Sequence, residues 1–122
     1  MSYIIDLATV TDERGSIAIA EKVIPFDIKR VYWIYQFNAK RGGHRHKKTI
    51  QALVCINGSC EIFIDNGEEK KSVMLDRSNK CLVLEPDDWH TMECYDKNAV
   101  LLVMASEYYD KDDYVYEPVD AG

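Results

Sequence analysis

No apolar run in the sequence reaches the roughly 18 residues that a helix needs to span a membrane. Residues 1–12 also lack the basic stretch, followed by a long apolar one, that marks a secretory signal peptide. These two absences exclude a membrane-spanning protein and an exported one. The sequence therefore predicts a cytoplasmic protein.

The cysteines form no Cys-x-x-Cys pair, which is the spacing typical of redox and zinc sites. A cytoplasmic protein keeps its thiols reduced, and each cysteine here lies beside apolar or β-forming residues. We therefore expect free thiols packed in the core at all four positions: Cys55, Cys60, Cys81 and Cys94.

A helical pattern of ten or more residues is also absent. Short β-forming stretches alternate with turn signals instead, at residues 3–7, 17–20, 28–37, 52–56, 60–65, 72–75, 81–85 and 99–105. About eight or nine short strands predict an all-β fold, either a sandwich or a small barrel that can hold one small ligand. The 122 residues suffice for one domain, residues 1–122, and leave no room for a second.

Turn signals separate these strands. Asn57-Gly58 predicts a hairpin, and Pro86-Asp87-Asp88 predicts a turn that presents Trp89 and His90. The acidic, tyrosine-rich segment 106–122 is compatible with a short helix or with a cover for a sheet edge.

Positive charge is scarce overall and concentrated locally. The net charge of -6 argues against a general nucleic-acid binder. Five of the fifteen basic residues nevertheless lie within residues 40–48. This run is either a solvated basic loop or a site that receives an anionic small ligand.

The same run contains two of the three histidines, His44 and His46. On an extended backbone these two side chains point to one face, and Arg45 points to the other. Paired imidazoles suit either metal ligation or proton transfer near neutral pH. In the preceding strand, alternation places Ile28, Arg30, Tyr32, Ile34 and Gln36 on one face and Val31, Trp33, Tyr35 and Phe37 on the other.

The spacing of His44, His46, Gln51 and Gly58 resembles the first motif of the cupin superfamily, a jelly-roll barrel. The resemblance places a Glu where this chain has Gln51. Many cupins bind a divalent metal through three histidines and that Glu. Loss of the carboxylate removes the ligand that best balances a dication, so metal binding is a weakened hypothesis here.

Pro86 and His90 resemble the second cupin motif, one residue shorter than usual. A more specific pattern covers nearly the whole chain. Its segments are, in order, Asp12-Glu13-Arg14-Gly15-Ser16, Pro25-Phe26-x-Ile28-Lys29-Arg30-Val31-Tyr32, Arg41-Gly42-x-His44-x-His46-Lys47-Lys48, Val54-Cys55-x-Asn57-Gly58-Ser59-Cys60, Trp89-His90-x-Met92 and Ala105-Ser106-x-Tyr108-Tyr109-Asp110. Together these segments resemble the dTDP-sugar 3,4-ketoisomerases, the WxcM-like cupins.

The chain departs from this pattern at two places. The family usually has Ala where this chain has Arg45, and the loop before Arg41 is about four residues shorter than the family pattern. Both departures bear on the rim of the pocket and on the choice of sugar.

The resemblance implies a single-domain cupin enzyme without metal or cofactor. Its substrate would be dTDP-4-keto-6-deoxy-glucose, whose ketone it would move from C4 to C3 for the biosynthesis of 3-amino-deoxysugars in surface polysaccharides. The family also implies a homodimer that exchanges N-terminal strands. Arg14-Gly15 together with His90 favours the galacto-configured product over the gluco one.

The chemistry assigns roles to five residues, and the resemblance assigns one to a sixth. A base must remove the C3 proton, and histidine suits this role because its pKa lies near neutral pH. We expect His46 to carry the proton between C3 and C4, with His44 orienting it or acting as a second acid or base. Tyr32 would stabilise the oxygen where charge develops.

Arginine forks suit a diphosphate, which points to Arg41 and Arg14. By resemblance, His90 lies at the pocket wall near the sugar. Three other functions remain open: a metal-dependent cupin enzyme, a dTDP-4-keto-sugar 3,5-epimerase, and a sugar-nucleotide binding module without activity.

Overall fold

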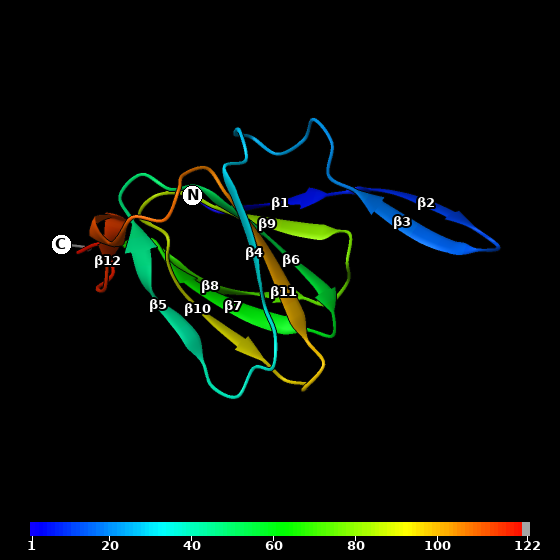
Figure 1. Ribbon diagram of the computed structural model, residues 1–122. Helices are drawn as coiled ribbons and strands as arrows, with labels where there is room; N and C mark the ends of the chain where they lie inside the picture. Colours follow the sequence, from blue (N-terminus) through cyan, green and yellow to red (C-terminus); the bar gives the residue numbers. More distant parts are fainter. Residues whose placement is uncertain (121–122) are drawn as a thin grey trace.

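Two five-stranded antiparallel sheets make up most of the molecule (Figure 1). The computed structural model describes residues 1–120. The first sheet contains, in spatial order, β1 (Tyr3–Asp6), β9 (Lys80–Leu84), β6 (Gln51–Asn57), β11 (Val100–Ala105) and β4 (Arg30–Ile34). The second sheet contains β12 (Tyr114–Val115), β5 (Arg41–His46), β10 (Trp89–Cys94), β7 (Cys60–Asp65) and β8 (Lys70–Leu75). A separate hairpin consists of β2 (Ala8–Asp12) and β3 (Gly15–Ile19).

This architecture confirms the all-β prediction and refines the predicted barrel. Within residues 1–120, no backbone ladder joins the first sheet to the second, so the strands form a sandwich rather than a closed barrel. The helical content of these residues is one 3-10 turn, Lys111–Asp113. No helix in the described part of the chain is long and apolar enough to cross a membrane.

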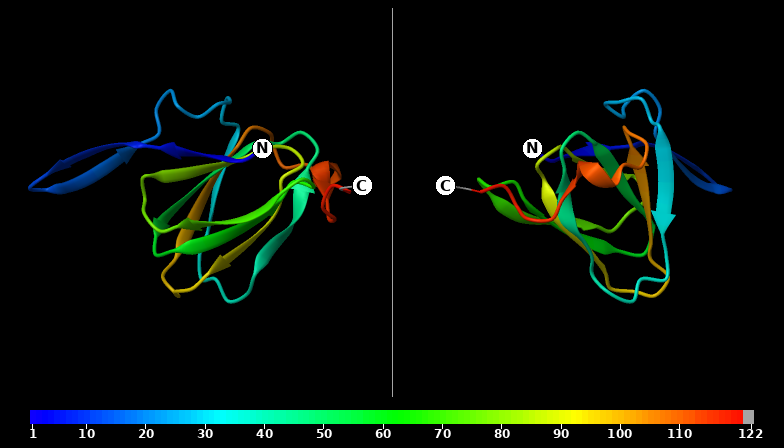
Figure 2. Two further views of the ribbon diagram at one scale, coloured as in Figure 1. Left: turned by 180° about the vertical axis from the view of Figure 1, so that it is seen from behind. Right: turned by 60° about the vertical axis from the view of Figure 1, so that its left-hand side comes forward.

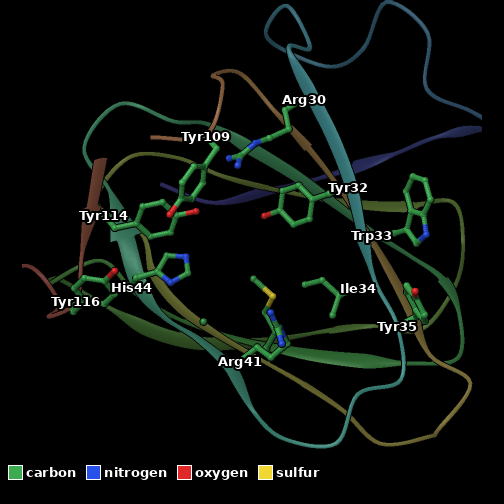
Figure 3. A pocket seen from close by; sticks show the side chains of 12 residues that line it. Arg30, Tyr32, Trp33, Ile34, Tyr35, Arg41, His44, Tyr109, Tyr114 and Tyr116 are labelled. Carbon is green, nitrogen blue, oxygen red and sulfur yellow. The ribbon is translucent and has the colours of Figure 1, made fainter. Parts of the chain in front are cut away.

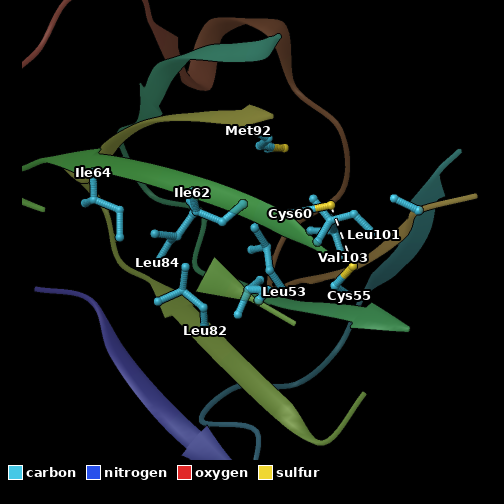
Figure 4. Packing of buried hydrophobic residues seen from close by; sticks show 12 residues of the cluster. Leu53, Cys55, Cys60, Ile62, Ile64, Leu82, Leu84, Met92, Leu101 and Val103 are labelled. Carbon is cyan, nitrogen blue, oxygen red and sulfur yellow. Dashed lines mark hydrogen bonds between the residues drawn. The ribbon is translucent and has the colours of Figure 1, made fainter. Parts of the chain in front are cut away.

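The main core lies between the two sheets (Figure 4). Alternation along β6 turns Leu53 and Cys55 into this core, while Ala52 and Val54 face the outside of the first sheet. The outward residues are buried as well, because Phe26 and other apolar residues pack over them. Strand β6 is thus buried on both faces, which explains its continuous apolar sequence.

The expectation of four free thiols is wrong for Cys60 and Cys94, which form a disulfide. They lie directly opposite each other in the ladder of β7 and β10, with a Cα–Cα distance of 4.1 Å. Sequence spacing gave no sign of this pairing because the two residues are 34 positions apart. Cys55 and Cys81 are free and buried, as predicted.

The predicted hairpin at Asn57-Gly58 is also wrong. Gly58 has a φ of +77°, as a tight turn requires, but β6 and β7 belong to different sheets. The turn is a corner between the sheets, fastened by a hydrogen bond from Asn57 Nδ2 to the carbonyl of Asn98 (2.7 Å). A local turn signal predicts the change of direction and not the partner of the next strand.

The N-terminal hairpin projects away from the sandwich in all views (Figure 2). Nearly all of its residues are exposed, including Val10 and Ile17. The backbone amide of Leu7, just before the hairpin, donates to the carbonyl of Asn79 (2.8 Å). The sequence had predicted only β3 and a turn in this region, and β2 was missed.

The C-terminal segment combines both structures that its sequence allowed. The 3-10 turn Lys111–Asp113 leads into β12, which pairs with the edge strand β5. Strand β10, also missed by the sequence analysis, carries His90 between β5 and β7. Strand β10 thereby brings His90 beside His44.

Candidate active site

A cavity of about 680 Å³ opens between the sheets, beside the C-terminal segment (Figure 3). Arg30, Tyr32 and Ile34 of β4 line one wall, as the predicted alternation requires, although Trp33 and Tyr35 of the opposite face border the cavity as well. His44 of β5 and Tyr114 of β12 line another. The alternation fails after Tyr35, because Gln36 has a φ of +56° and Phe37 turns back to pack against the main core, contrary to prediction.

The three histidines form one cluster. The ring of His44 lies 5.2 Å from that of His46 and 5.0 Å from that of His90, measured between centroids. His44 faces the cavity, whereas His46 and His90 lie behind it and are 3% and 1% exposed. The predicted pairing of His44 with His46 on one face of a strand is therefore seen in the structure.

A close approach between strands brings His90 to this cluster. His90 pairs with His44 in the ladder of β5 and β10, and the ladder shifts at the next residue, where Thr91 faces Gly42. A Cβ on Gly42 would lie 2.8 Å from the carbonyl oxygen of His90, and Gly42 has a φ of +88°. Glycine is required here for both reasons.

Asp113, which directly precedes β12 at the edge of β5, holds the side chain of His46. The Oδ2 atom of Asp113 accepts a hydrogen bond from Nδ1 of His46 (2.9 Å) and one from Thr49 Oγ1 (2.5 Å). Its Oδ1 atom accepts from the backbone amides of Lys47 (3.1 Å) and Lys48 (2.8 Å). These donors satisfy a carboxylate that is only 3% exposed.

The pKa values of this pair follow from the same contacts. Burial alone would raise the pKa of Asp113, but the hydrogen bonds from Thr49, His46 and Lys48 lower it below its ordinary value. Burial lowers the pKa of His46, and Asp113 opposes that shift. At neutral pH the carboxylate is ionised, so Nδ1 of His46 carries the proton and its Nε2 atom has a free lone pair. The Nε2 atom is buried and has no hydrogen-bond partner among the described residues.

The other two histidines are neutral near pH 7. Burial and the neighbouring His46 lower the pKa of His44 to about 4. Burial lowers the pKa of His90 to about 3, although its Nδ1 atom donates to the carbonyl of Asp88 (3.0 Å). The cluster therefore offers neutral imidazoles, which can both accept and donate protons.

Tyr32 lies across the cavity from His44 (Figure 3). Its hydroxyl oxygen accepts a hydrogen bond from Nε2 of Gln51 (3.0 Å), and burial raises its pKa. The phenol proton therefore stays on the oxygen at neutral pH and remains available to an acceptor in the cavity. Gln51, which stands where the cupin pattern has Glu, supports a tyrosine here.

The arginines predicted to bind phosphate lie in different places. Arg41 lines the cavity, but Arg14 sits at the turn of the N-terminal hairpin and forms an ion pair with Asp12 (2.6 Å). Arg14 therefore does not reach the cavity of its own chain. Sequence analysis missed Arg30, whose guanidinium lies over the rings of Tyr32 (5.2 Å) and Tyr109 (5.8 Å) at the cavity wall.

Metal-binding geometry is not found in residues 1–120, where no group of three or more His, Cys, Asp or Glu side chains could hold an ion. His46 uses its Nδ1 atom for Asp113, and Gln51 binds Tyr32. The donors left around the cluster are thus neutral imidazole nitrogens without a carboxylate.

Asp113, Thr49 and Tyr114 are the other site residues that sequence analysis missed. Asp113 lies 67 positions from His46 and is brought to it by the pairing of β12 with β5. The sequence did show an acidic, tyrosine-rich C-terminal segment. Nothing in that pattern says which carboxylate faces inward.

Comparison with known proteins identifies relatives of the whole chain. A family model, FdtA: WxcM-like, C-terminal, matches residues 1–120. The TDP-4-oxo-6-deoxy-alpha-D-glucose-3,4-oxoisomerase of Aneurinibacillus thermoaerophilus is 41% identical over 116 residues, which cover 92% of this chain and 84% of that protein.

Solved structures of 3,4-ketoisomerases also match most of the chain. A 3,4-ketoisomerase from Helicobacter canadensis matches with a TM-score of 0.90 and 38% identity, over 95% of this chain and 90% of that one. The sugar 3,4-ketoisomerase QdtA from Thermoanaerobacterium thermosaccharolyticum, in complex with TDP, matches with a TM-score of 0.90 and 39% identity, over 95% and 88%. A histidine-to-asparagine variant of QdtA has been solved with TDP-4-keto-6-deoxyglucose.

A more distant likeness shows the fold alone. The dTDP-6-deoxy-D-glucose-3,5-epimerase RmlC from Legionella pneumophila matches with a TM-score of 0.81 at 14% identity, over 94% of this chain and 71% of that one. The sandwich is thus the jelly-roll-like cupin fold that the sequence predicted.

Proposed function

The chain belongs to the dTDP-sugar 3,4-ketoisomerases, the WxcM-like family of the cupin superfamily, and on that premise we propose that it converts dTDP-4-keto-6-deoxy-glucose to a dTDP-3-keto-6-deoxy-hexose. It is accordingly an isomerase, an intramolecular oxidoreductase that moves a keto group within a TDP-hexose. One observation carries the proposed mechanism: a carboxylate holds His46, directly behind His44 of the cavity wall, in the tautomer that a base requires, and a protonated tyrosine lines the same cavity.

The first step is loss of the C3 proton, which is acidic because it lies next to the C4 ketone. We assign this step to Nε2 of His46, since its Nδ1 atom is occupied by Asp113. The proton then returns to C4. His44 lies on the cavity wall with its ring 5.2 Å from that of His46, and it serves as the orienting group or as the second acid or base.

The oxygens must exchange a proton as the double bond moves. Loss of the C3 proton places negative charge on O4, which the Tyr32 hydroxyl stabilises by donating its hydrogen. Gln51 donates to the Tyr32 oxygen and thereby orients that hydroxyl. The C3 hydroxyl gives up its proton to O4 as C4 is protonated, so the C3–H and O3–H bonds are broken and the C4–H and O4–H bonds are formed.

The diphosphate is assigned to arginines. Arg41 and Arg30 approach the cavity from opposite sides in Figure 3. Planar guanidinium groups bind phosphate oxygens through paired hydrogen bonds. No metal ion or cofactor enters this mechanism.

Arg14 needs a second copy of the chain. It lies at the tip of a projecting, exposed hairpin and cannot contribute to its own cavity. The outer face of the first sheet exposes Val31, Trp33 and Tyr35, which are 48%, 57% and 60% exposed. Large exposed apolar groups of this kind favour an interface. We propose a homodimer in which each hairpin crosses to its partner.

The galacto-configured product is part of the same proposal. It rests on the sequence resemblance carried by Arg14-Gly15 and His90. The neutral ring of His90 lies 5.0 Å from that of His44, which faces the cavity. An aminotransferase acting on the 3-keto product would complete a 3-amino-deoxysugar pathway in the cytoplasm.

Proton NMR of the purified protein with dTDP-4-keto-6-deoxy-glucose, in D2O with EDTA, tests the proposal. A 3-keto product is expected, with deuterium at C4 to the extent that His46 exchanges its proton with solvent before it protonates C4, and the couplings of the product give its configuration. Exchange at C3 and C5 with the ketone still at C4 would indicate a 3,5-epimerase. Activity that EDTA abolishes would indicate a metal-dependent cupin, and TDP binding without turnover a binding module.

A double substitution, His44→Ala with His46→Ala, tests the mechanism. It should abolish turnover and leave TDP affinity nearly unchanged, because the nucleotide is assigned to other residues. Turnover that survives this change would reject the histidine mechanism.

A further inference from the structure

The C-terminal segment forms one wall of the cavity, and its position depends on a few contacts. Residues 113–117 are called the strap here. Within it, Tyr114 pairs with His46 and Val115 pairs with Arg45. Tyr114 and Tyr116 line the cavity, with their rings stacked at 6.4 Å between centroids. Tyr116 lies 6.5 Å from the ring of His44, so it extends the aromatic wall outward from the histidine cluster.

The two ends of the strap are held differently. At its beginning, the carboxylate of Asp113 is buried and accepts four hydrogen bonds. At its end, the carbonyl of Glu117 accepts from Nε of Arg45 (2.9 Å), and the carbonyl of Tyr116 accepts from the indole nitrogen of Trp89 (3.1 Å). Tyr116 is 68% exposed, so little packing holds it. Its position therefore depends on the contacts of Arg45 and Trp89.

Arg45 also connects the strap to the rest of the site. Its side chain lies on the face of β5 opposite the histidines, and its Nη1 atom forms an ion pair with Asp87 (2.5 Å). Asp87 has a φ of +76°, and its amide donates to the carbonyl of His46 (3.1 Å). The turn containing Asp87 leads directly into Trp89 and His90. One guanidinium thus joins β5, this turn and the strap.

We propose that Arg45 is a positioning residue for sugar-nucleotide binding, and that it acts by holding Tyr116 at the cavity wall. It uses two sides of its guanidinium for this, one on the carboxylate of Asp87 and one on the carbonyl of Glu117. It touches neither the cavity nor the histidine rings. Arg45 should therefore affect the affinity for the sugar nucleotide and not the rate of proton transfer. This inference rests on the proposed function.

Steady-state kinetics of Arg45→Ala provide the first test. We expect KM for the keto sugar nucleotide to rise about fivefold, the scale of the net contribution of one ordinary hydrogen bond, with kcat within about twofold of wild type. Arg45→Lys keeps the charge toward Asp87 but cannot form both contacts, so it should restore KM only in part. Arg77→Ala removes a comparable ion pair, with Asp6 at 3.1 Å, and should leave KM unchanged.

A spectroscopic readout tests the position of the strap without turnover. In a Trp33→Phe background, Trp89 is the remaining tryptophan. Arg45→Ala should make Trp89 more accessible to acrylamide quenching, because its bond to the Tyr116 carbonyl becomes transient. TDP affinity, measured by calorimetry, should fall by the same factor as KM rises. Unchanged quenching and affinity would overturn the proposal.

A double-mutant cycle with Tyr116→Ala decides whether Arg45 acts through that residue. If it does, adding Arg45→Ala to Tyr116→Ala should raise KM no further. Additive effects would show that Arg45 acts elsewhere and would overturn the proposal. A wild-type protein that binds TDP but fails to isomerise the sugar would reject the proposed function, and the quenching and TDP affinities would still decide the role of Arg45.

Discussion

At the scale of single residues, Asp113 determines which nitrogen of His46 carries the proton. Asp113→Asn would replace the carboxylate with an amide that can donate to Nδ1 and so move the imidazole proton to Nε2. The base would then lack its lone pair on the reacting side. We expect kcat to fall about a hundredfold or more, as when an orienting carboxylate is lost from a catalytic histidine. Initial rates, obtained by NMR on reactions quenched at set times, would measure the change in kcat.

A neighbouring carboxylate provides the matched control. Asp110 lies three residues earlier, caps the 3-10 turn and binds Lys48 at the surface. Asp110→Asn should leave kcat within about twofold of wild type, because an exposed ion pair contributes little. TDP affinity should be unchanged in both variants. An Asp113→Asn protein with wild-type kcat would show that His46 does not depend on this carboxylate.

Sequence reasoning found the residues whose relation is local. The two-residue spacing of His44 and His46 predicted a shared face because a strand alternates with period two. The same rule placed Tyr32 in the cavity wall. It could not find Asp113, whose contact with His46 depends on a ladder between distant segments. Arg14 was predicted as a diphosphate ligand because of its guanidinium group. That group says nothing about the hairpin, which places Arg14 away from the cavity of its own chain.

At the scale of elements, the strands were largely predictable and their partners were not. The segment 60–65 coincides with β7, and 28–37 contains β4 with the expected faces. Asn57-Gly58 predicted a turn correctly, yet the next strand joins the other sheet. Pairing depends on contacts between residues far apart in sequence, which alternation and turn chemistry do not encode. The disulfide was missed for the same reason.

The pairing of β7 with β10 gives a prediction for the cysteines. The protein unfolded in guanidinium without reductant should show two reactive thiols, from Cys55 and Cys81. After reduction it should show four. The disulfide closes a segment of 34 residues, so its loss should lower the free energy of unfolding by about 2–4 kcal/mol.

A variant provides the control for this measurement. In Cys60→Ser, reductant should no longer change the urea midpoint, because no disulfide remains to be reduced. Mass spectrometry after alkylation counts the thiols directly. Four thiols before reduction would contradict the pairing.

At the scale of the whole molecule, the buried histidines set the response of stability to pH. The unfolded chain binds protons at its histidines near the ordinary pKa of 6.5, whereas folded His44 and His90 do so only near 4 and 3. Between these values the unfolded state binds more protons. Stability should therefore be greatest above pH 6.5 and should fall as the pH drops toward 4.

Urea unfolding at pH 7.5, 6 and 5 would measure this fall. A histidine that stays neutral on folding, such as His90 with 1% exposure, adds up to about 1.4 kcal/mol per pH unit to the slope. His90→Gln should reduce the slope of the free energy of unfolding against pH by the contribution of one histidine, even if the variant is less stable than wild type at every pH. A urea midpoint independent of pH over this range would contradict neutral burial of the cluster.

The proposed exchange of hairpins makes a site from two chains, so two inactive variants should complement each other. Arg14→Ala removes the proposed diphosphate ligand from the hairpin, and His46→Ala removes the proposed base from the sandwich. In a mixed dimer, the site that contains the intact His46 receives the intact Arg14 from its partner. Random pairing makes half of the dimers mixed, and each has one complete site, so about a quarter of wild-type activity should return.

Co-expression with two affinity tags would isolate these mixed dimers. The matched control pairs His44→Ala with His46→Ala, because both histidines belong to the same sandwich and no mixed dimer then contains a complete site. Recovery in the first pair and not in the second would show that the hairpin serves the partner's cavity. Equal failure of both pairs, with dimers present, would mean that Arg14 does not reach the other chain, and an active Arg14→Ala protein would remove Arg14 from the site altogether.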